Sequence, residues 1–258
     1  MTIIATGDQT PIPLARLVVV EVRKMFTTRS GSWLMMSIGI TALIGTAATI
    51  AFAPEESLTY FMFATAIGYP MAFTLPIIAM LSVTSEWSQR SGLVTFVQVP
   101  RQGRVMASKA LAAGVVGVAA MLVAFVIGAV GHLVGTAVAG VDAVWDVSVG
   151  HGALIVLGNL LSMATGYMLG VLLRSSAASV VAYFVYVLIV PGLLALLGEL
   201  RPGVADIQGW MDFNVAQVPV FEGAMTGETW AQLAVSSIGW LLIPLAIGLT
   251  RVRRSEVT

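Results

Sequence analysis

The 258-residue chain contains no cysteine and few charged residues. The missing cysteine excludes a disulfide framework and any metal or redox chemistry that uses thiolates. Charged residues make up 10% of the sequence, whereas hydrophobic residues make up 58% and the mean hydropathy is +0.94. This balance is too apolar for a water-soluble fold and predicts an all-α integral membrane protein that crosses the bilayer several times.

Motifs for hydrolysis and nucleotide binding are also missing. The sequence has no HExxH zinc-protease motif and no GxSxG nucleophile elbow. Its two lysines, Lys24 and Lys109, do not follow the glycine of a phosphate-binding loop, so ATP hydrolysis would need a separate polypeptide. We therefore expect no catalytic residue and no cofactor in this chain.

Histidine is scarce, with only His132 and His151 present. A metal site needs three or four ligands, and no other candidates accompany these two, so we expect no metal centre. Both histidines should lie near the outer ends of membrane spans. There they either pair, line an extracellular gate, or simply occupy the interface.

Six apolar runs have the length of a membrane-spanning helix, which needs about 20 residues to cross the hydrocarbon core. We place the spans at residues 33–53, 58–83, 110–138, 151–173, 177–198 and 230–250. Prolines, which remove helical hydrogen bonds, lie inside the second, fifth and sixth spans, at Pro70, Pro76, Pro191 and Pro244. Small residues at four-residue spacing in the fourth span predict a close helix contact: Gly158, Ser162, Gly166 and Gly170.

Charge is strongly segregated between the two sides of these spans. All basic residues except Arg201 fall on one side, together with four acidic residues, while nine acidic residues fall on the other. Because cytoplasmic loops carry the excess of Lys and Arg, both termini are expected in the cytoplasm. Residues 1–10 contain no basic residue, so we expect no cleavable signal peptide.

The chain thus divides into three expected regions. Residues 1–32 form a cytoplasmic N-terminus with an amphipathic helix over 11–30, which either lies in the inner interface or packs on a soluble subunit. Residues 33–250 form the six-helix transmembrane domain, and 251–258 a cytoplasmic tail. Within the domain, 84–109 is a cytoplasmic segment, and the aromatic residues of the external segment 199–229 predict short helices in the outer interface.

The predicted spans contain no charged residue. Proton or sodium coupling, voltage sensing and selectivity by charged rings all need ionisable groups at depth, so an ion-coupled carrier or a channel is disfavoured. An ATP-independent carrier or channel is therefore the weakest of the functions that this composition allows.

Two stretches carry a resemblance to a known family. They are EVRKMFTTRS, residues 21–30, and EWSQRSGLVTFVQVPRQGRVMASK, residues 86–109. Together with six spans, a basic interfacial helix and a long external segment before the last span, they resemble the ABC-2 type permeases, the membrane subunits of bacterial ABC exporters. Arg90-Ser91-Gly92 departs from the glycine-threonine that is more usual in this family.

The resemblance implies that residues 84–109 contain a coupling helix seated in a groove of a soluble ATPase. The residues that would carry this role are Glu86, Trp87, Arg90, Arg101 and Arg104. It further implies two copies of the ATPase, which would hold ATP and Mg, and a second permease subunit in a homodimer or heterodimer. The complex would sit among lipids of the bacterial plasma membrane and would bind no nucleic acid.

The resemblance also places a substrate cavity along the dimer interface, near spans 1, 2 and 5. The aromatic residues available in the second and fifth spans are Phe61, Phe63, Tyr69, Phe73, Tyr183, Phe184 and Tyr186. Uncharged aromatic surfaces favour an apolar or amphipathic cargo, such as a drug-like natural product, lipid or peptide, moved by alternating access. The same side chains also fit ordinary core packing.

A second function fits the same sequence. A non-transporting membrane anchor or immunity protein would recruit an ATPase or sequester a peptide at its external segment. It would need that segment for activity and would move no substrate.

Overall fold

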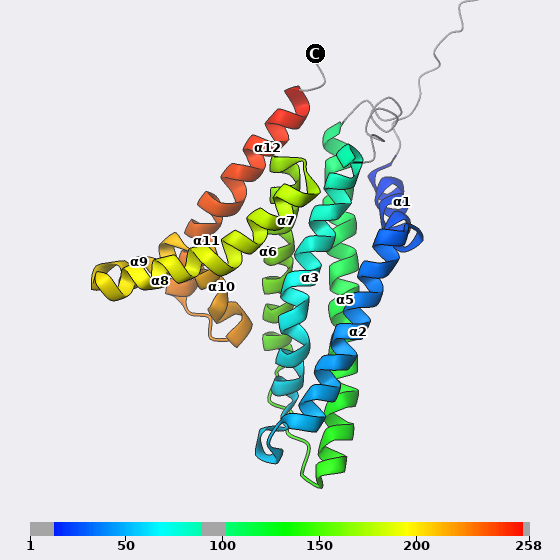
Figure 1. Ribbon diagram of the computed structural model, residues 1–258, viewed down its shortest axis with the longest axis vertical. Helices are drawn as coiled ribbons and strands as arrows, with labels where there is room; N and C mark the ends of the chain where they lie inside the picture. The colour runs from blue at the N-terminus through cyan, green and yellow to red at the C-terminus, as the bar shows by residue number, and fades with distance from the viewer. Residues whose placement is uncertain (1–12, 89–101, 255–258) are drawn as a thin grey trace, which may run out of the picture.

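The computed structural model describes residues 13–88 and 102–254 of the chain, and these residues are almost entirely helical (Figure 1). Six helical segments within them are long and apolar enough to cross a membrane. The protein is therefore a multi-pass, all-helical membrane protein, and the prediction of six spans is confirmed.

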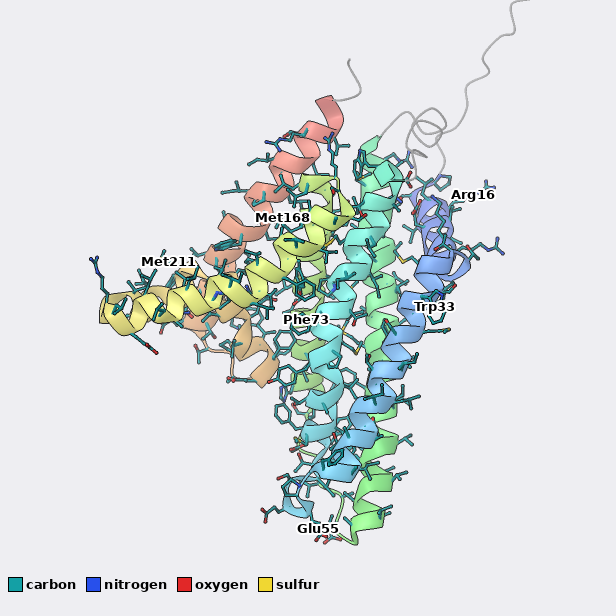
Figure 2. All side chains as sticks on the ribbon, in the orientation of Figure 1. Arg16, Trp33, Glu55, Phe73, Met168 and Met211 are labelled. Carbon is teal, nitrogen blue, oxygen red and sulfur yellow. The ribbon has the colours of Figure 1, made fainter. Side chains whose placement is uncertain are left out.

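The chain begins with a short amphipathic helix, α1 (Leu14–Thr27), followed directly by the first long helix, α2 (Arg29–Phe52). Thr28 separates them because its backbone is extended, and its side chain caps α2 by accepting a hydrogen bond from the amide of Gly31. α1 lies at the same end of the molecule as the end of the last helix (Figure 1). We call this the inner end, and Figure 2 shows Arg16 there and Glu55 at the opposite, outer end.

The next three long helices are α3 (Tyr60–Ser88), α5 (Gln102–Ala139) and α6 (Val149–Leu173), and a 3₁₀ turn, η1 (Glu55–Ser57), precedes α3. α3 and α5 continue beyond the spans predicted at 58–83 and 110–138. Both ends of the segment 84–109 are therefore helical. Residues 89–101, in the middle of this segment, lie outside the described residues.

α2, α3, α5 and α6 stand along the long axis of the molecule and enclose the larger apolar core (Figure 1). The predicted small-residue contact of α6 is confirmed at Gly166 and Gly170, which face α3, whereas Gly158 and Ser162 face α10 (Phe213–Glu222). A Cβ atom at Gly166 would lie 2.3 Å from the carbonyl oxygen of Pro76, and one at Gly170 would lie 3.0 Å from that of Met80. These glycines allow two helix backbones to touch.

The last two spans diverge from this bundle, and each contains one turn of π-helix. The fifth span consists of α7 (Ser176–Phe184), η2 (Val185–Ile189) and α8 (Val190–Leu200). The sixth consists of α11 (Gly227–Ser237), η3 (Ile238–Leu242) and α12 (Ile243–Arg254). Pro191 and Pro244 each lie just after a π turn. This is expected, because proline removes a backbone donor and the hydrogen-bond pattern of the helix must change there.

The segment 199–229 contains two short helices, α9 (Pro202–Met211) and α10 (Phe213–Glu222), as predicted, whereas their place in the outer interface stays a prediction. Both lie near the middle of the long axis, away from the outer ends of α2 and α5 (Figure 1). A second apolar core joins α10 to α6, η2 and α11. This arrangement holds α10 against the outer half of α6.

Candidate functional site

Four charged side chains meet at the inner end of the bundle. α1 contributes Glu21 and Lys24, α3 contributes Glu86, and α5 contributes Lys109. The Lys109 ammonium lies 2.7 Å from a Glu21 carboxylate oxygen and 2.9 Å from one of Glu86. The Lys24 ammonium lies 2.8 Å from Glu21 and 3.7 Å from Glu86. We call these four residues the inner charge cluster.

The inner charge cluster is largely buried and has no net formal charge. Lys109 is 1% exposed and Glu86 4%, whereas the Lys24 side chain is about half exposed at the edge. Partial burial alone would lower the pKa of Lys24, but its hydrogen bond and attraction to Glu21, and the charge of Glu86, outweigh burial and raise it. Since a buried charge is costly unless it is paired, the cluster requires α1, α3 and α5 to stay together.

The inner end of α3 also contacts the turn between α6 and α7. The Arg174 guanidinium carbon lies 5.6 Å from the centre of the Trp87 ring, in cation–π geometry. One turn earlier, the hydroxyl oxygens of Thr84 and Ser176 are 2.7 Å apart. Arg174 itself has a left-handed backbone with φ of 54°, which ends α6 abruptly and starts α7 within two residues.

The structure describes three of the five predicted coupling residues. Glu86 faces into the protein as part of the inner charge cluster, Trp87 is half-buried beneath Arg174, and Arg104 is half-buried near the start of α5. Arg90 and Arg101 lie outside the described residues. Direct contact of these residues with an ATPase stays a prediction.

Sequence reasoning missed the inner charge cluster as a unit. The prediction places Lys109 at the end of the cytoplasmic segment 84–109, although Lys109 is among the most deeply buried large side chains of the described chain. A usable signal was present in α1. Glu21 falls on the same helical face as Val18, Val22 and Met25, where a charge needs a partner.

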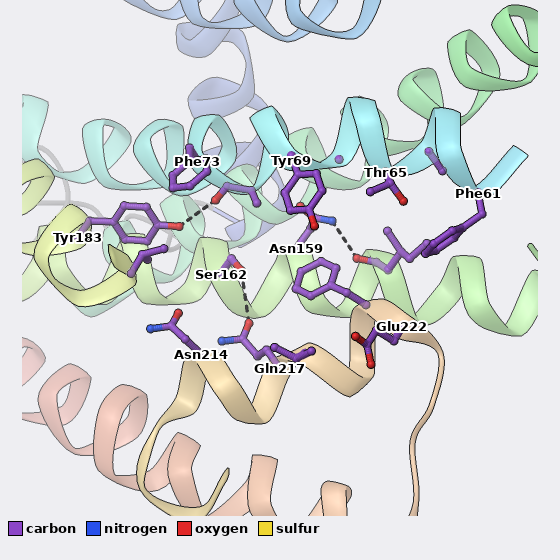
Figure 3. A pocket seen from close by; sticks show the side chains of 17 residues that line it. Phe61, Thr65, Tyr69, Phe73, Asn159, Ser162, Tyr183, Asn214, Gln217 and Glu222 are labelled. Atoms are coloured by element: carbon purple, nitrogen blue, oxygen red, sulfur yellow. Dashed lines mark hydrogen bonds between the residues drawn. The ribbon is translucent and has the colours of Figure 1, made fainter. Parts of the chain in front are cut away.

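A cavity of about 570 Å³ lies in the outer half of the protein, between α3, α6, α7 and α10 (Figure 3). We call it the outer cavity. Its walls are mostly apolar and aromatic, with a few uncharged polar groups and one carboxylate. The lining residues are Phe61, Ala64, Thr65, Gly68, Tyr69, Ala72, Phe73, Ile155, Asn159, Ser162, Tyr183, Val187, Asn214, Gln217, Val218, Phe221 and Glu222.

Amide and hydroxyl groups form a polar strip across one wall of the outer cavity (Figure 3). The Ser162 hydroxyl donates to the Gln217 amide oxygen at 3.3 Å, and Gln217 donates to the Phe213 carbonyl at 3.0 Å. Asn159, which is 3% exposed, donates to the Ile155 carbonyl at 2.9 Å. Its Oδ1 atom has no hydrogen-bond partner within the described residues.

Four of the seven predicted cavity residues line the outer cavity: Phe61, Tyr69, Phe73 and Tyr183. The other three lie in its surroundings. Phe63 is fully buried against His132, the Phe184 ring stacks on Phe73 with centroids 6.1 Å apart, and Tyr186 packs against Trp240. The fourth span and α10 supply much of the lining, which the sequence did not predict.

The two histidines occupy different environments near the outer end. His132 is fully buried among the rings of Tyr60, Phe63 and Trp145, and neither of its ring nitrogens has a hydrogen-bond partner in the described chain. His151 Nε2 lies 2.8 Å from the carbonyl oxygen of Phe221, to which it donates. Within residues 13–88 and 102–254, no group of three or more His, Asp or Glu side chains is placed to hold a metal ion.

A comparison of the chain with known protein families found no match, and a comparison with curated protein sequences found none either. The features that bear on function are therefore the inner charge cluster, the outer cavity and the helix that connects them.

Proposed function

We propose that this chain is the permease subunit of an ABC exporter of the ABC-2 type in a bacterial plasma membrane. It would work with a second permease subunit and two copies of a soluble ATPase, which would bind ATP and Mg. Its cargo would be an apolar or amphipathic molecule, moved by alternating access. In this role the chain is not itself an enzyme.

The observation that carries the proposal is the inner charge cluster. It ties α1 to the inner ends of α3 and α5, the two helices that bracket residues 89–101. A force applied to residues 89–101 would act on α1, α3 and α5 as one unit, because moving these helices apart would separate buried ions from their partners. We therefore assign Glu86 to holding this unit together, and the neighbouring basic residues to contact with the ATPase.

α3 supplies the connection between the two ends of the molecule. It is a single helix that carries Glu86 at the inner end and Phe73 at the inner limit of the outer cavity. These residues are 13 positions apart, or about 20 Å along a helix. Tilting of the inner end would thus change the spacing of α3 from α6 and α10, where the outer cavity lies, and such coupling of rigid elements is a standard route for conformational change.

The proposal is tested on the complex isolated from its native membrane with a tag on this chain. We expect a soluble ATPase to co-purify and its turnover to rise when the permease is present in lipid nanodiscs. The variant R90A/R101A should lose this stimulation. The variant R253A/R254A, which removes two positive charges from the same side of the membrane, should keep it.

Two results would count against the exporter. If no ATPase co-purifies, or if R90A/R101A stimulates as well as the unaltered chain, residues 89–101 are not the coupling contact. If an ATPase binds but vesicles move no cargo, and trimming residues 199–229 abolishes activity, the anchor or immunity function is favoured instead.

A further inference from the structure

We propose that Arg174 and Arg251 bind the phosphate headgroup of one anionic phospholipid at the inner end of the protein. The headgroup would lie between the turn that joins α6 to α7 and the last turn of α12, and an acyl chain would follow the exposed face of α12. We call these two residues the arginine pair. The site does not depend on the proposed exporter function.

Helix contacts bring the arginine pair together. α12 packs on the inner half of α6, where a Cβ atom at Gly248 would lie 3.0 Å from the Val171 side chain and 3.2 Å from the backbone of Leu172. Both helices run toward the inner end and finish there (Figure 1). Each arginine follows its residue of this contact by three positions, so Arg174 and Arg251 lie at the same level, nearly one helical turn closer to the inner surface.

The described part of the chain does not neutralise the arginine pair. Neither Arg174 nor Arg251 forms an ion pair with a carboxylate of residues 13–88 and 102–254, and the nearby Glu86 is bound to lysine within the inner charge cluster. Burial lowers the pKa of the Arg174 guanidinium, and repulsion by Arg251 lowers it further, although arginine stays charged. An anion between two guanidinium groups that repel each other is attracted by both.

Arg174 is held in position for such a contact. Its guanidinium carbon lies 5.6 Å from the centre of the Trp87 ring, and among its side-chain nitrogens only Nη2 is fully buried, so Nε and Nη1 can reach a ligand. Arg251 is exposed. A planar guanidinium that is already fixed on a ring loses less conformational entropy when it binds phosphate, and its N–H groups match two phosphate oxygens.

The surface next to Arg251 fits an acyl chain. Ile247 and Ile243 precede it by four and eight residues, on one side of α12, and are 44% and 52% exposed. Basic residues between helices on the cytoplasmic side bind anionic headgroups, and the inner end is the side predicted to be cytoplasmic. A water-soluble phosphate compound would leave this apolar face unused, so the combination favours a phospholipid.

The test uses the full chain purified in a neutral detergent. Native mass spectra and thermal unfolding are recorded with increasing dioleoyl phosphatidylglycerol or dioleoyl phosphatidylcholine, and with glycerol phosphate as the soluble headgroup. The variant R174Q/R251Q removes the arginine pair. The matched control R16Q/R23Q removes two exposed arginines of α1 at the same end.

We expect one phosphatidylglycerol to bind the unaltered chain about tenfold more tightly than phosphatidylcholine, and glycerol phosphate to have no effect. R174Q/R251Q should lose this preference, whereas R16Q/R23Q should keep it. The single variant R251Q removes the repulsion, so without lipid it should melt at the same temperature as the unaltered chain or higher. It should nevertheless gain less from phosphatidylglycerol, which distinguishes a lost lipid site from a damaged fold.

Equal binding of the two lipids, an equal loss of preference in R16Q/R23Q, or an equal effect of glycerol phosphate would overturn the proposal. A variant R251Q that melts lower without lipid and gains as much from phosphatidylglycerol would overturn it too. Because no ATPase is present in these measurements, their outcome is separate from that of the exporter function.

Discussion

The Tyr183 hydroxyl of α7 donates a 2.8 Å hydrogen bond to the backbone carbonyl of Ala72 in α3. Ala72 is four residues before Pro76, and proline has no N–H to offer that carbonyl. A tyrosine from another helix thus supplies the donor that a proline withholds. In a membrane this matters, since no water is present in the hydrocarbon core to take its place.

Removing this hydroxyl should destabilise the chain unless the helix recovers its own donor. We expect Tyr183→Phe to lower the free energy of unfolding by about 1–3 kcal/mol, because it leaves a buried carbonyl without a partner. The double variant P76A/Y183F restores an N–H and should lose less. Thermal and denaturant unfolding in detergent measure this, with Tyr69→Phe, on an exposed cavity residue, as the control. Equal losses in the single and double variants would refute the pairing.

The buried lysine of the inner charge cluster should matter far more than the half-exposed one. Lys109→Met leaves two glutamates with only Lys24 between them, and breaking a buried ion pair costs about 3–5 kcal/mol. Lys24→Met removes a partner that water can replace and should cost well under half as much. Adding Glu21→Gln to Lys109→Met should recover part of the loss. Unfolding curves of the unaltered protein and the three variants measure these losses of stability. Similar losses for the two lysine variants would contradict the buried geometry.

Stability should depend on pH through Asp212, which lies between the last two spans. Its side chain is fully buried and caps α10 by accepting from the amide of Asn214 at 2.8 Å, while its second oxygen has no partner among the described residues. Burial raises the pKa of Asp212, although hydrogen bonds from the amides of Asn214 and Val215 oppose this. The unfolded chain then releases this proton at lower pH than the folded one, so ionisation favours unfolding.

The stabilising contribution of Asp212 is therefore complete below its unfolded pKa and is lost as the pH rises through the higher folded value. Asp212→Asn keeps an N-capping oxygen and removes the ionisation. We expect the melting temperature of the variant relative to the unaltered protein to rise between about pH 4 and pH 8, by a few degrees at most. A difference that falls over this range would show that the carboxylate is stabilised in the fold.

Adding even one methyl group at the contact between α3 and α6 should destabilise the protein. Gly166→Ala would place a Cβ atom 2.3 Å from the Pro76 carbonyl oxygen, so the helices must separate, at a cost of about 1–3 kcal/mol or more. Gly114→Ala in α5 meets nothing within 4 Å and should be neutral or slightly stabilising. Comparing the two variants by thermal unfolding tests the packing, and equal effects would refute it.

Hydropathy and charge were sufficient to predict the six spans because both are local properties of the chain. The ends of α3 and α5 were misjudged for a physical reason. Glu86 and Lys109 were assigned to an aqueous segment because a lone charge belongs in water, yet each neutralises the other within the protein at 2.9 Å. Such a pair lies 23 residues apart in sequence, so no window of residues along the chain could reveal it.

The lining of the outer cavity was predictable only where aromatic side chains marked a helix face. Phe61, Tyr69, Phe73 and Tyr183 are predicted cavity residues that line the outer cavity, although the resemblance places the substrate cavity at a dimer interface and the outer cavity lies within one chain. The polar strip was not predicted, because Asn159 and Gln217 acquire a role only when α10 folds back against α6. The enclosure of His132 likewise depends on Trp145, which reaches it from the loop after α5.

The composition of the inner charge cluster bears on how the protein is made. Glu21 and Lys24 neutralise each other within α1, three residues apart. Glu86 and Lys109 neutralise each other between the inner ends of α3 and α5. During translation, each glutamate of the cluster is thus followed by its lysine partner before the next residue of the cluster is synthesised. The inner end of the nascent chain therefore holds at most one unpaired charge of this cluster at any time.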